Sequence, residues 1–387
     1  MKKGLLLVTL GTGLIADIAL AANPFNFFAD KSPIKALSTV EAGITVTSVT
    51  DDLDHPWGMA FLPDGRILVT ERSGSVRYVS SNGSKSEPLA GLPKIEVGGQ
   101  GGLFDLILDP GFANNHRVYF SYSEPGDGGN STAVARATLQ ENALSDLKVI
   151  FRQEPKIKSS HHFGGQLVFD RDGNLFITLG DRSSQRADAQ TLNTHHGKVV
   201  RIRLDGSIPA DNPFVNKSDA LGAIWSYGHR NVQGAALNPQ TGQLWTHEHG
   251  PQGGDEINIT QAGKNYGWPA ITYGEEYGGG KIGETAKDGM EQPLHYWVPS
   301  IAPSGMAFYT GSLFPAWNND LLVGSLKFGE LVRLDLDDDK VVREERINIG
   351  SRIRDVRQGP DGAVYLLTDE NNGQLLRLTP ATAKPGK

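Results

Sequence analysis

The sequence predicts an all-β protein: a six-bladed β-propeller whose functional site lies at one end of the central channel. Two observations predict this fold. The 47 glycines and 21 prolines are scattered along the 387 residues, as in chains built from many short strands and tight turns. One pattern also recurs: an apolar residue, a turn rich in Pro, Asp, Asn or Gly, and a short β-branched or aromatic run ending in a polar residue.

Six copies of this pattern follow one another along the chain. They are FLPDGRILVTER from Phe61, LDPGFANNHRVYFSYSE from Leu108, FDRDGNLFITLGD from Phe169, LNPQTGQLWTHEHG from Leu237, FPAWNNDLLVGSLK from Phe314 and GPDGAVYLLTDE from Gly359. Their spacings fit propeller blades of about 40 to 50 residues with inserted loops. A β-sandwich or a β-helix would also have short strands, but the irregular insertions disfavour a β-helix and the chain is long for one sandwich.

Each copy ends in residues that are able to do chemistry. These ends are Glu71-Arg72, Glu124, Asp181, Glu248-His249, Lys327 and Asp369-Glu370. In a propeller, loops from several blades converge at one mouth of the channel, so we expect a site assembled from many blades there.

The first 22 residues predict a secretory signal peptide, because two lysines precede an apolar run and a small-residue Ala-Leu-Ala-Ala end. We expect cleavage near Ala21 or Ala22 and a periplasmic or secreted protein, with residues 23–387 forming a single propeller domain. Asp17 interrupts the apolar run, and an N-terminal membrane anchor is the alternative. No other segment is apolar over the roughly 18 residues of a membrane span, so we expect no stable membrane insertion.

Composition excludes two further classes of protein. The chain has no cysteine, so the hydrophobic core rather than a disulfide framework must hold the exported protein. The formal charge of −7 argues against a nucleic-acid partner, which requires a basic face to neutralise phosphates.

The segment EHGPQGGDEINITQAGKNYGWP, from Glu248 to Pro269, is the richest in candidate ligands. Its Gly-Pro-x-Gly-Gly turn leaves backbone carbonyls free, and Asp255 and Glu256 add carboxylates. Oxygen donors on an irregular loop are what Ca²⁺ prefers, although a polar turn between blades is an equal alternative. The carboxylates lack the spacing of an EF-hand.

Several cations stand in short motifs of the second half: Arg230 in YGHRNVQG, Lys327 in GSLKFGE, and Arg352 with Arg354 in SRIRDV. On a strand, Arg352 and Arg354 would point to one face. Their convergence in an acidic protein would indicate an anionic ligand, because arginine suits carboxylates. Taken singly, each cation is more typical of a surface salt bridge than of a ligand site.

Histidines occur as adjacent pairs in HHFGG and NTHHGK. Adjacent residues on a strand point to opposite faces, and no helical pair or cysteine completes a tetrahedral set, so zinc binding is disfavoured. One histidine of the first pair facing the channel as a general base is more plausible, since its pKa lies near neutrality. No G-x-S-x-G elbow supports a serine hydrolase.

Taken together, six ordered segments resemble the soluble quinoprotein glucose dehydrogenase family, and most closely its periplasmic aldose sugar dehydrogenases. They are GQGGLFDLILDPGFANNHRVYFSYS, HHFGGQLVFDRDGNLFITLGD, IWSYGHRNVQG, EHGPQGGDEINITQAGKNYGWP, GSLKFGE and SRIRDV. The resemblance extends from about Leu53 to Pro380. It implies a six-bladed propeller that binds pyrroloquinoline quinone (PQQ) and Ca²⁺ and oxidises the anomeric hydroxyl of aldoses.

The resemblance also implies a role for particular residues. His162 matches the catalytic base, and Arg230 matches the cation that stabilises the oxyanion formed on reduction. The matches to cofactor-binding positions are Gln100, Arg230, Asn231, Lys327, Arg352 and Arg354, with looser matches at Tyr277 and Trp297. The carbonyls of Gly250 and Pro251 match ligands of the Ca²⁺ at the quinone, while Glu256 and Tyr266 match a further, structural Ca²⁺.

The loop PAITYGEEYGGGKIG after Trp268 is compact compared with the glucose-preferring branch, which favours a broad aldose range on a monomer. The expected partners are an aldose substrate and an external electron acceptor. Two other functions stay open: a cofactor-free propeller that binds glycans or proteins, and a metal-dependent lactonase. A neutral glycan gives no reason to gather Lys327, Arg352 and Arg354, whereas a tricarboxylate does.

Overall fold

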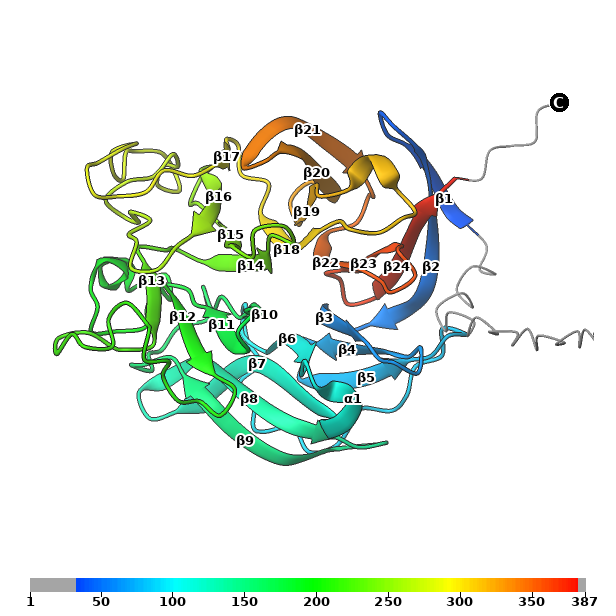
Figure 1. Cartoon of the computed structure of the whole chain (residues 1–387), viewed down its shortest axis with the longest axis horizontal. Coiled ribbons are helices and arrows are strands. Elements are labelled where there is room, and N and C mark those ends of the chain that lie inside the picture. The colour runs from blue at the N-terminus through cyan, green and yellow to red at the C-terminus, as the bar shows by residue number, and fades with distance from the viewer. Residues whose placement is uncertain (1–32, 382–387) are drawn as a thin grey trace, which may run out of the picture.

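The computed structural model describes residues 33–381 and shows six antiparallel sheets arranged as blades around a central axis (Figure 1). The six-bladed propeller expected from the repeats is thereby confirmed. The expected signal peptide, residues 1–22, lies outside the described residues. No helix within residues 33–381 is long and apolar enough to cross a membrane.

The blades follow one another in chain order, except that the last one combines both ends of the described chain. Blade 1 holds β3 (Pro56–Phe61), β4 (Ile67–Glu71) and β5 (Ser75–Val79). Blade 2 holds β6 (Leu103–Leu108), β7 (Arg117–Gly126), β8 (Gly129–Leu139) and β9 (Leu144–Arg152). Blade 3 holds β10 (Leu167–Phe169), β11 (Asn174–Thr178), β12 (Lys198–Arg203) and β13 (Ile224–Tyr227).

Blade 4 holds β14 (Val232–Leu237), β15 (Leu244–Glu248), β16 (Asp255–Thr260) and β17 (His295–Trp297). Blade 5 holds β18 (Pro303–Phe308), β19 (Leu321–Ser325), β20 (Glu330–Asp337) and β21 (Lys340–Asn348). Blade 6 holds β22 (Ile353–Gln358), β23 (Val364–Thr368), β24 (Gly373–Pro380), β2 (Gly43–Leu53) and β1 (Pro33–Ser38). The short helical elements are α1 (Phe112–Asn115), η2 (Arg186–Gln190) and η3 (Pro315–Trp317).

The six sequence repeats correspond to the six blades. Each repeat spans the turn between the first and the second strand of a blade, from β3–β4 in blade 1 to β22–β23 in blade 6. Five of the six second strands are buried along their whole length, as in ILVTE of β4 and VYLLT of β23, and β7 is buried from Val118 to Ser123. Apolar side chains on both faces of a strand are required where a sheet packs between two neighbouring sheets.

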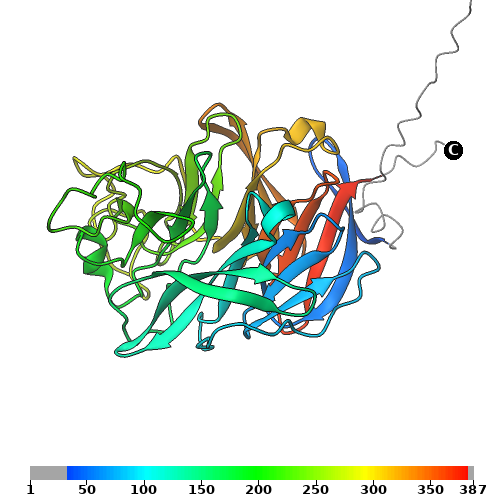
Figure 2. The same ribbon diagram turned by 60° about the horizontal axis from the view of Figure 1, so that its bottom comes forward.

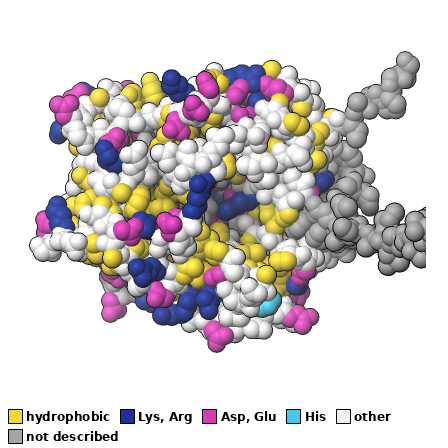
Figure 3. Space-filling view, viewed as in Figure 1, with side chains coloured by type: hydrophobic (Ala, Val, Ile, Leu, Met, Phe, Trp, Pro, Cys, Tyr) yellow, Lys and Arg dark blue, Asp and Glu magenta, His cyan; other side chains and the backbone are white. Residues whose placement is uncertain are grey.

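The core is therefore divided into layers between adjacent blades. Leu68 of blade 1, for example, packs in one cluster with Leu106 and Phe120 of blade 2. The ring is closed by β2, which pairs antiparallel with β24 so that the N-terminal strands complete blade 6, as Figure 2 shows. In the space-filling view of Figure 3, acidic and basic side chains are interspersed over the visible face, which offers no single basic patch for a nucleic acid.

Candidate functional site

A pocket of about 190 Å³ lies where the six blades meet. It is lined by Trp57, Arg72, Gln100, Phe104, Phe163, Gly164, Asn231, Gln233, His249, Ala302, Leu326, Arg352, Arg354 and Asp369. Every blade contributes, from the residues just before or at the beginning of its first strand or from those that follow its second strand. We call this cavity the channel pocket. It lies at the end of the propeller where the second strands finish, which is the position expected from the repeats.

Four of the residues named from the sequence line the channel pocket: Gln100, Asn231, Arg352 and Arg354. Arg354, whose residue is 8% exposed, contacts Asp369 through Nη2 at 2.6 Å and donates from Nη1 to Oε1 of Gln233 at 3.1 Å. Nη2 of Arg352 reaches the same Asp369 carboxylate at 3.4 Å. The two arginines therefore do point to one side, as expected, although the strand pairing shifts between Ile353 and Asp355.

The pocket gathers more positive charge than its own carboxylate balances. Of the described residues that line it, Arg72, Arg352 and Arg354 are cationic and Asp369 is acidic. Burial would raise the pKa of Asp369, but the attraction of Arg354 outweighs it and holds that pKa far below its usual value. Burial lowers the pKa of Arg72, and the nearby cations Arg354 and Arg352 lower it further. Nε of Arg354 is buried without a hydrogen-bond partner.

Lys327 stands at the edge of this cluster rather than in the pocket lining. It is exposed, and its ammonium lies 5.1 Å from the centre of the Phe328 ring. The preceding residue, Leu326, does line the pocket, and its carbonyl accepts a hydrogen bond from Arg352 Nη1 at 3.1 Å. The ammonium of Lys327 is thus available to a ligand at the rim.

The histidine pair in HHFGG divides into one exposed and one buried residue. The pair precedes β10 in a loop, so the strand placement used in the sequence argument was wrong. The two side chains diverge because His162 adopts a left-handed conformation with φ of 53°. His161 is exposed and contacts Ser160 Oγ through Nδ1 at 3.0 Å. His162 is buried, and its backbone N–H donates to Oε1 of Gln100 at 2.8 Å.

His162 is oriented by a buried carboxylate. Its Nδ1 lies 2.6 Å from Oδ1 of Asp181, and Oδ2 of Asp181 accepts a hydrogen bond from Nε1 of Trp268 at 2.8 Å. Burial lowers the pKa of His162, while the hydrogen bond to Asp181 opposes that shift. Within residues 33–381, Nε2 of His162 has no hydrogen-bond partner. The histidine is therefore neutral near pH 7, with its proton on Nδ1 and a free lone pair on Nε2, which is the arrangement of a general base.

Glycine is required beside this histidine. Gly164 has φ of 66°, and a Cβ there would lie 2.5 Å from the carbonyl oxygen of Thr178. The Gly164 amide donates to Oδ1 of Asn231 at 3.1 Å, so the glycine and the asparagine together fix the backbone that follows His162.

Arg230 lies between the base and the loop that carries the carbonyl candidates. It is buried, its guanidinium lies 5.5 Å from the Trp268 ring, and Nη1 donates to the carbonyls of His249 and Gly250 at 3.0 and 2.9 Å. A cation placed on the Gly250 carbonyl would have to share that oxygen with Arg230 or displace it. Pro251, the other carbonyl candidate, follows directly on the same turn.

A second, much smaller cavity of about 10 Å³ adjoins this loop. Glu248, Glu256, Tyr266 and Thr272 are among the residues that line it. Burial together with the charge of Glu248 raises the pKa of Glu256 to about 8. A bound cation would relieve this repulsion, so the carboxylates fit a cation site. The described residues contain no cluster of three or more His, Asp or Glu side chains that could hold a metal, so backbone oxygens would have to complete the ligand set.

The remaining two residues named from the sequence lie away from the channel pocket. Tyr277 is 72% exposed on the loop between β16 and β17. Trp297 is 3% exposed, belongs to the core between blades 4 and 5, and donates to Glu344 at 2.9 Å. The structure brings neither ring to the lining of the pocket.

Among the further contributors to the site, Arg72, Asp181 and Asp369 were named from the sequence only as polar ends of repeats, without a role of their own, and Trp268 was given no role. Arg72 and Asp369 directly follow the second strand of a blade and Asp181 lies three residues after one, at the polar ends of the repeats, so the repeat pattern contained a signal for them. Trp268 lies in an irregular loop and carried no such signal.

Comparison with known proteins finds similarity to sugar dehydrogenases both in sequence and in structure. The family model described as Glucose / Sorbosone dehydrogenase matches residues 53–377. Aldose sugar dehydrogenase YliI of Escherichia coli is 48% identical over 89% of this chain and 95% of its own length. The apo-form structure of the soluble aldose sugar dehydrogenase of Escherichia coli superposes with a TM-score of 0.85 at 47% identity, covering 87% of this chain and all of that one. The PQQ-bound aldose sugar dehydrogenase of Streptomyces coelicolor has a TM-score of 0.72 at 26% identity, covering 87% of this chain and 99% of that one.

Proposed function

We propose that this chain, which belongs to the Glucose / Sorbosone dehydrogenase family, oxidises the anomeric hydroxyl of aldose sugars to lactones with PQQ and calcium as cofactors. The family and its named relatives are sugar-oxidising oxidoreductases. The observation that carries the finer proposal is the placement of a neutral, carboxylate-oriented histidine beside a pocket with surplus positive charge.

The channel pocket fits a ligand with several carboxylates. Arg354 is buried and Arg72 is half-buried, Asp369 balances their charge only in part, and Nε of Arg354 has no partner. Cations removed from water in this way are stabilised when an anion binds beside them and accepts their hydrogen bonds. Arg72, Arg352, Arg354 and Lys327 would hold the carboxylates of PQQ, and Gln100 and Asn231 would contact it from the other side of the pocket. When bound, the quinone supplies a two-electron hydride acceptor, which Ca²⁺ on the Gly250 and Pro251 carbonyls would make more electrophilic.

In this proposal, residues of the chain itself accept the proton of the anomeric hydroxyl and stabilise the charges that form. Nε2 of His162 takes the proton of the anomeric hydroxyl as the hydride leaves the sugar carbon, and a C=O bond forms to give the lactone. Asp181 keeps the proton of the resting histidine on Nδ1 and stabilises the cation that forms. Arg230, 6% exposed next to this base, stabilises negative charge that develops on its side of the site.

The proposal extends to cellular context. We place the mature chain, residues 23–387, in the periplasm or outside the cell as a monomer that passes electrons to an external acceptor. Glu256 and Tyr266 would hold a second, structural Ca²⁺ at the smaller cavity.

Reconstitution tests the proposal. The apo-protein should gain dye-linked oxidation of aldoses when PQQ and Ca²⁺ are added together. His162→Gln should bind PQQ as the wild type does, while kcat falls by about 10²- to 10⁴-fold, the contribution of a positioned base. A reconstituted protein that oxidises no aldose would refute the function, and full turnover by His162→Gln would refute the assignment of the base. Lactone hydrolysis with Ca²⁺ alone would instead favour the lactonase alternative.

A further inference from the structure

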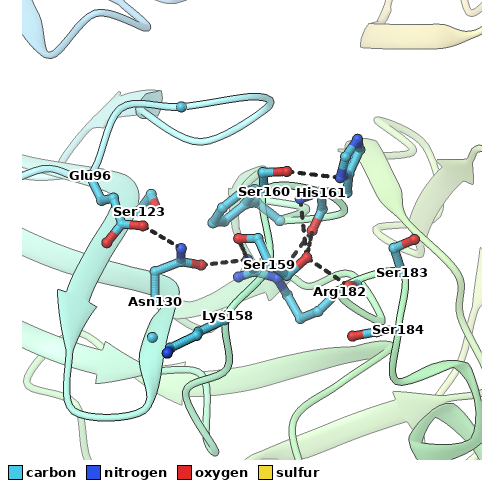
Figure 4. Close-up of a pocket in the computed structure, with 13 residues that line it drawn as sticks. Glu96, Ser123, Asn130, Lys158, Ser159, Ser160, His161, Arg182, Ser183 and Ser184 are labelled. Atoms are coloured by element: carbon cyan, nitrogen blue, oxygen red, sulfur yellow. Dashed lines mark hydrogen bonds between the residues drawn. The ribbon is translucent and has the colours of Figure 1, made fainter.

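A larger cavity, of about 530 Å³, lies beside the loop that carries the catalytic histidine (Figure 4). It is formed by the segment before β6, the β7–β8 hairpin, the loop before β10 and the residues after β11. Its lining is polar apart from Gly98, Gly129 and Phe163: Glu96, Ser123, Asn130, Lys158, Ser159, Ser160, His161, Arg182, Ser183 and Ser184. Phe163 also lines the channel pocket, so one wall separates the two cavities.

Arg182 forms the floor of this cavity and is a buried cation without a counter-ion. It is 0% exposed, and no ion pair to it exists in the described part of the chain. Its guanidinium donates only to neutral oxygens, the carbonyls of His161 and Ser159 and Oδ1 of Asn130, and lies 3.7 Å from the Phe163 ring. Nη1 has no partner at all. Burial lowers the pKa of this guanidinium to about 10, although Asp181 and Glu96 lie near enough to oppose the shift.

Two further groups in the lining lack partners. Oγ of Ser123 is buried and makes no hydrogen bond, and the exposed Lys158 forms no ion pair with any described residue. The carboxylate of Glu96 is engaged, because Oε1 accepts a hydrogen bond from Asn130 at 2.7 Å. Two cations and one engaged carboxylate leave the cavity with unsatisfied donors and a positive balance, which suits a ligand that is both hydroxylated and anionic.

We propose that this cavity binds the carboxylate-bearing unit of an acidic saccharide, a uronate, whose reducing end is the aldose at His162. The proposal rests on the function proposed above and names a substrate class for it. The volume lies within the range of about 300–1,000 Å³ that is usual for small-molecule sites. His161 lines this cavity, and its ring centre is 6.4 Å from that of His162, so a saccharide whose reducing end lies at His162 can extend its next unit towards the cavity. A neutral sugar alone would leave Arg182 without a counter-ion.

Binding to the apo-protein tests the cavity without any redox chemistry. Methyl β-glucuronide cannot be oxidised at its blocked anomeric position, and calorimetry should show that it binds about 10- to 100-fold more tightly than methyl β-glucoside, the increment of a charge-assisted contact. Equal affinity for the two glycosides would overturn the proposal. Tighter binding of inorganic phosphate or glucose 1-phosphate would also overturn it, because the same cations would then serve a phosphate.

A cavity-filling variant with a matched control localises the binding. A side chain at Gly98 would meet open space, and its φ is not positive, so Gly98→Trp should fill the cavity without backbone strain. Val97 is 54% exposed and does not line the cavity, so Val97→Trp adds the same indole next to it. Gly98→Trp should abolish the preference for methyl β-glucuronide, and Val97→Trp should retain it. Ser123→Ala, which removes only the unpartnered hydroxyl, should weaken glucuronide binding about 3- to 10-fold.

Kinetics connect the cavity to turnover. In the reconstituted enzyme, kcat/KM for cellobiouronate, a glucuronosyl-glucose, should exceed that for cellobiose about 10-fold or more, and Gly98→Trp should bring the ratio close to one. A wild-type ratio near one would refute the subsite while leaving aldose oxidation standing. If no aldose is oxidised, the proposed function fails, and the calorimetric result still decides whether the cavity binds uronates.

Discussion

The hydrogen bond between Asp181 and His162 allows a sharp prediction, because the carboxylate has three fixed donors around it. Oδ1 accepts from Nδ1 of His162 at 2.6 Å and from the Ser183 amide at 2.7 Å, while Oδ2 accepts from Trp268 Nε1 at 2.8 Å. In Asp181→Asn, one of the two oxygens becomes an NH₂ group, which must meet either Trp268 or the His162 side. An indole N–H is a donor only, so the NH₂ group cannot be satisfied next to Trp268.

The NH₂ group meets a donor in either orientation, Trp268 Nε1 on one side and the Ser183 amide on the other, but only on the His162 side can a neighbour, Nδ1, accept from it, so we expect the amide to turn that way. Nδ1 then accepts, the proton moves to Nε2, and Nε2 loses the lone pair that takes the substrate proton. Loss of the charge-assisted hydrogen bond costs about 1.5–3 kcal/mol, or about 10- to 100-fold in rate. The wrong tautomer adds to this, and we expect kcat/KM for an aldose to fall by about 10³-fold, within the range for a general base.

The Trp268→Phe background provides the control. Without the indole N–H, the amide oxygen can stay at the Oδ1 position, where it accepts from both His162 and Ser183. Asp181→Asn combined with Trp268→Phe should therefore be at least about 10-fold more active than Asp181→Asn alone. Dye-linked aldose oxidation, measured with saturating PQQ and Ca²⁺, gives both numbers. Equal activity of the two variants, or an unimpaired single variant, would contradict the tautomer argument.

Three further predictions follow from the site and its surroundings. Arg354→Met should raise the Kd for PQQ about 10- to 100-fold in an absorbance titration, whereas Trp297→Phe should leave that Kd unchanged and lower only the Tm, since Trp297 lies in the core. Ca²⁺ should raise the Tm of the wild type and not that of Glu256→Gln, because the variant lacks the Glu256 carboxylate. Burial and repulsion by Glu248 raise the pKa of that carboxylate to about 8. An equal Ca²⁺ response of both proteins would exclude Glu256 as a ligand. Burial lowers the pKa of His247 from 6.5 to about 4. Between about pH 6.5 and pH 4, His247 is therefore protonated in the unfolded chain and neutral in the folded chain, so the free energy of unfolding falls as the pH drops through this window. His247 contributes a slope of up to about 1.4 kcal/mol per pH unit. In urea unfolding, the free energy of unfolding should therefore fall more between pH 7 and pH 5 in the wild type than in His247→Gln.

The propeller could be predicted from the sequence because its signal is local. Each blade repeats a turn and a second strand that is buried over most or all of its length, so six copies of one short pattern specify six blades without any knowledge of their contacts. The pairing of β2 with β24 left no such trace, because it joins residues more than 300 positions apart by backbone hydrogen bonds that any sequence can form.

The site could be predicted only where one short motif carries its own chemistry. Arg352 and Arg354 are two residues apart, so strand-like alternation predicts that both guanidiniums lie on one side, and both reach Asp369 although Arg352 precedes β22. The division between His161 and His162 was anticipated, but its cause was not: a positive φ in a loop, rather than the alternation of a strand, separates them. Trp297 packs in the core between blades 4 and 5, a placement that the sequence could not provide, since an aromatic residue near a loop is compatible with both a cofactor contact and the core.

His162, the proposed catalytic base, is held by contacts from several blades, and this makes its position a property of the whole ring. Gln100, before blade 2, fixes the His162 backbone; Asp181, after the second strand of blade 3, fixes its ring; and Trp268, from the long loop of blade 4, fixes Asp181. None of these partners lies within fifteen residues of His162. Because each blade is itself held by layers of apolar side chains between neighbours, a rotation of one blade against the next would move these groups relative to one another. A propeller therefore provides what a general base requires: a neutral, buried imidazole whose orientation depends on rigid packing rather than on the loop that carries it.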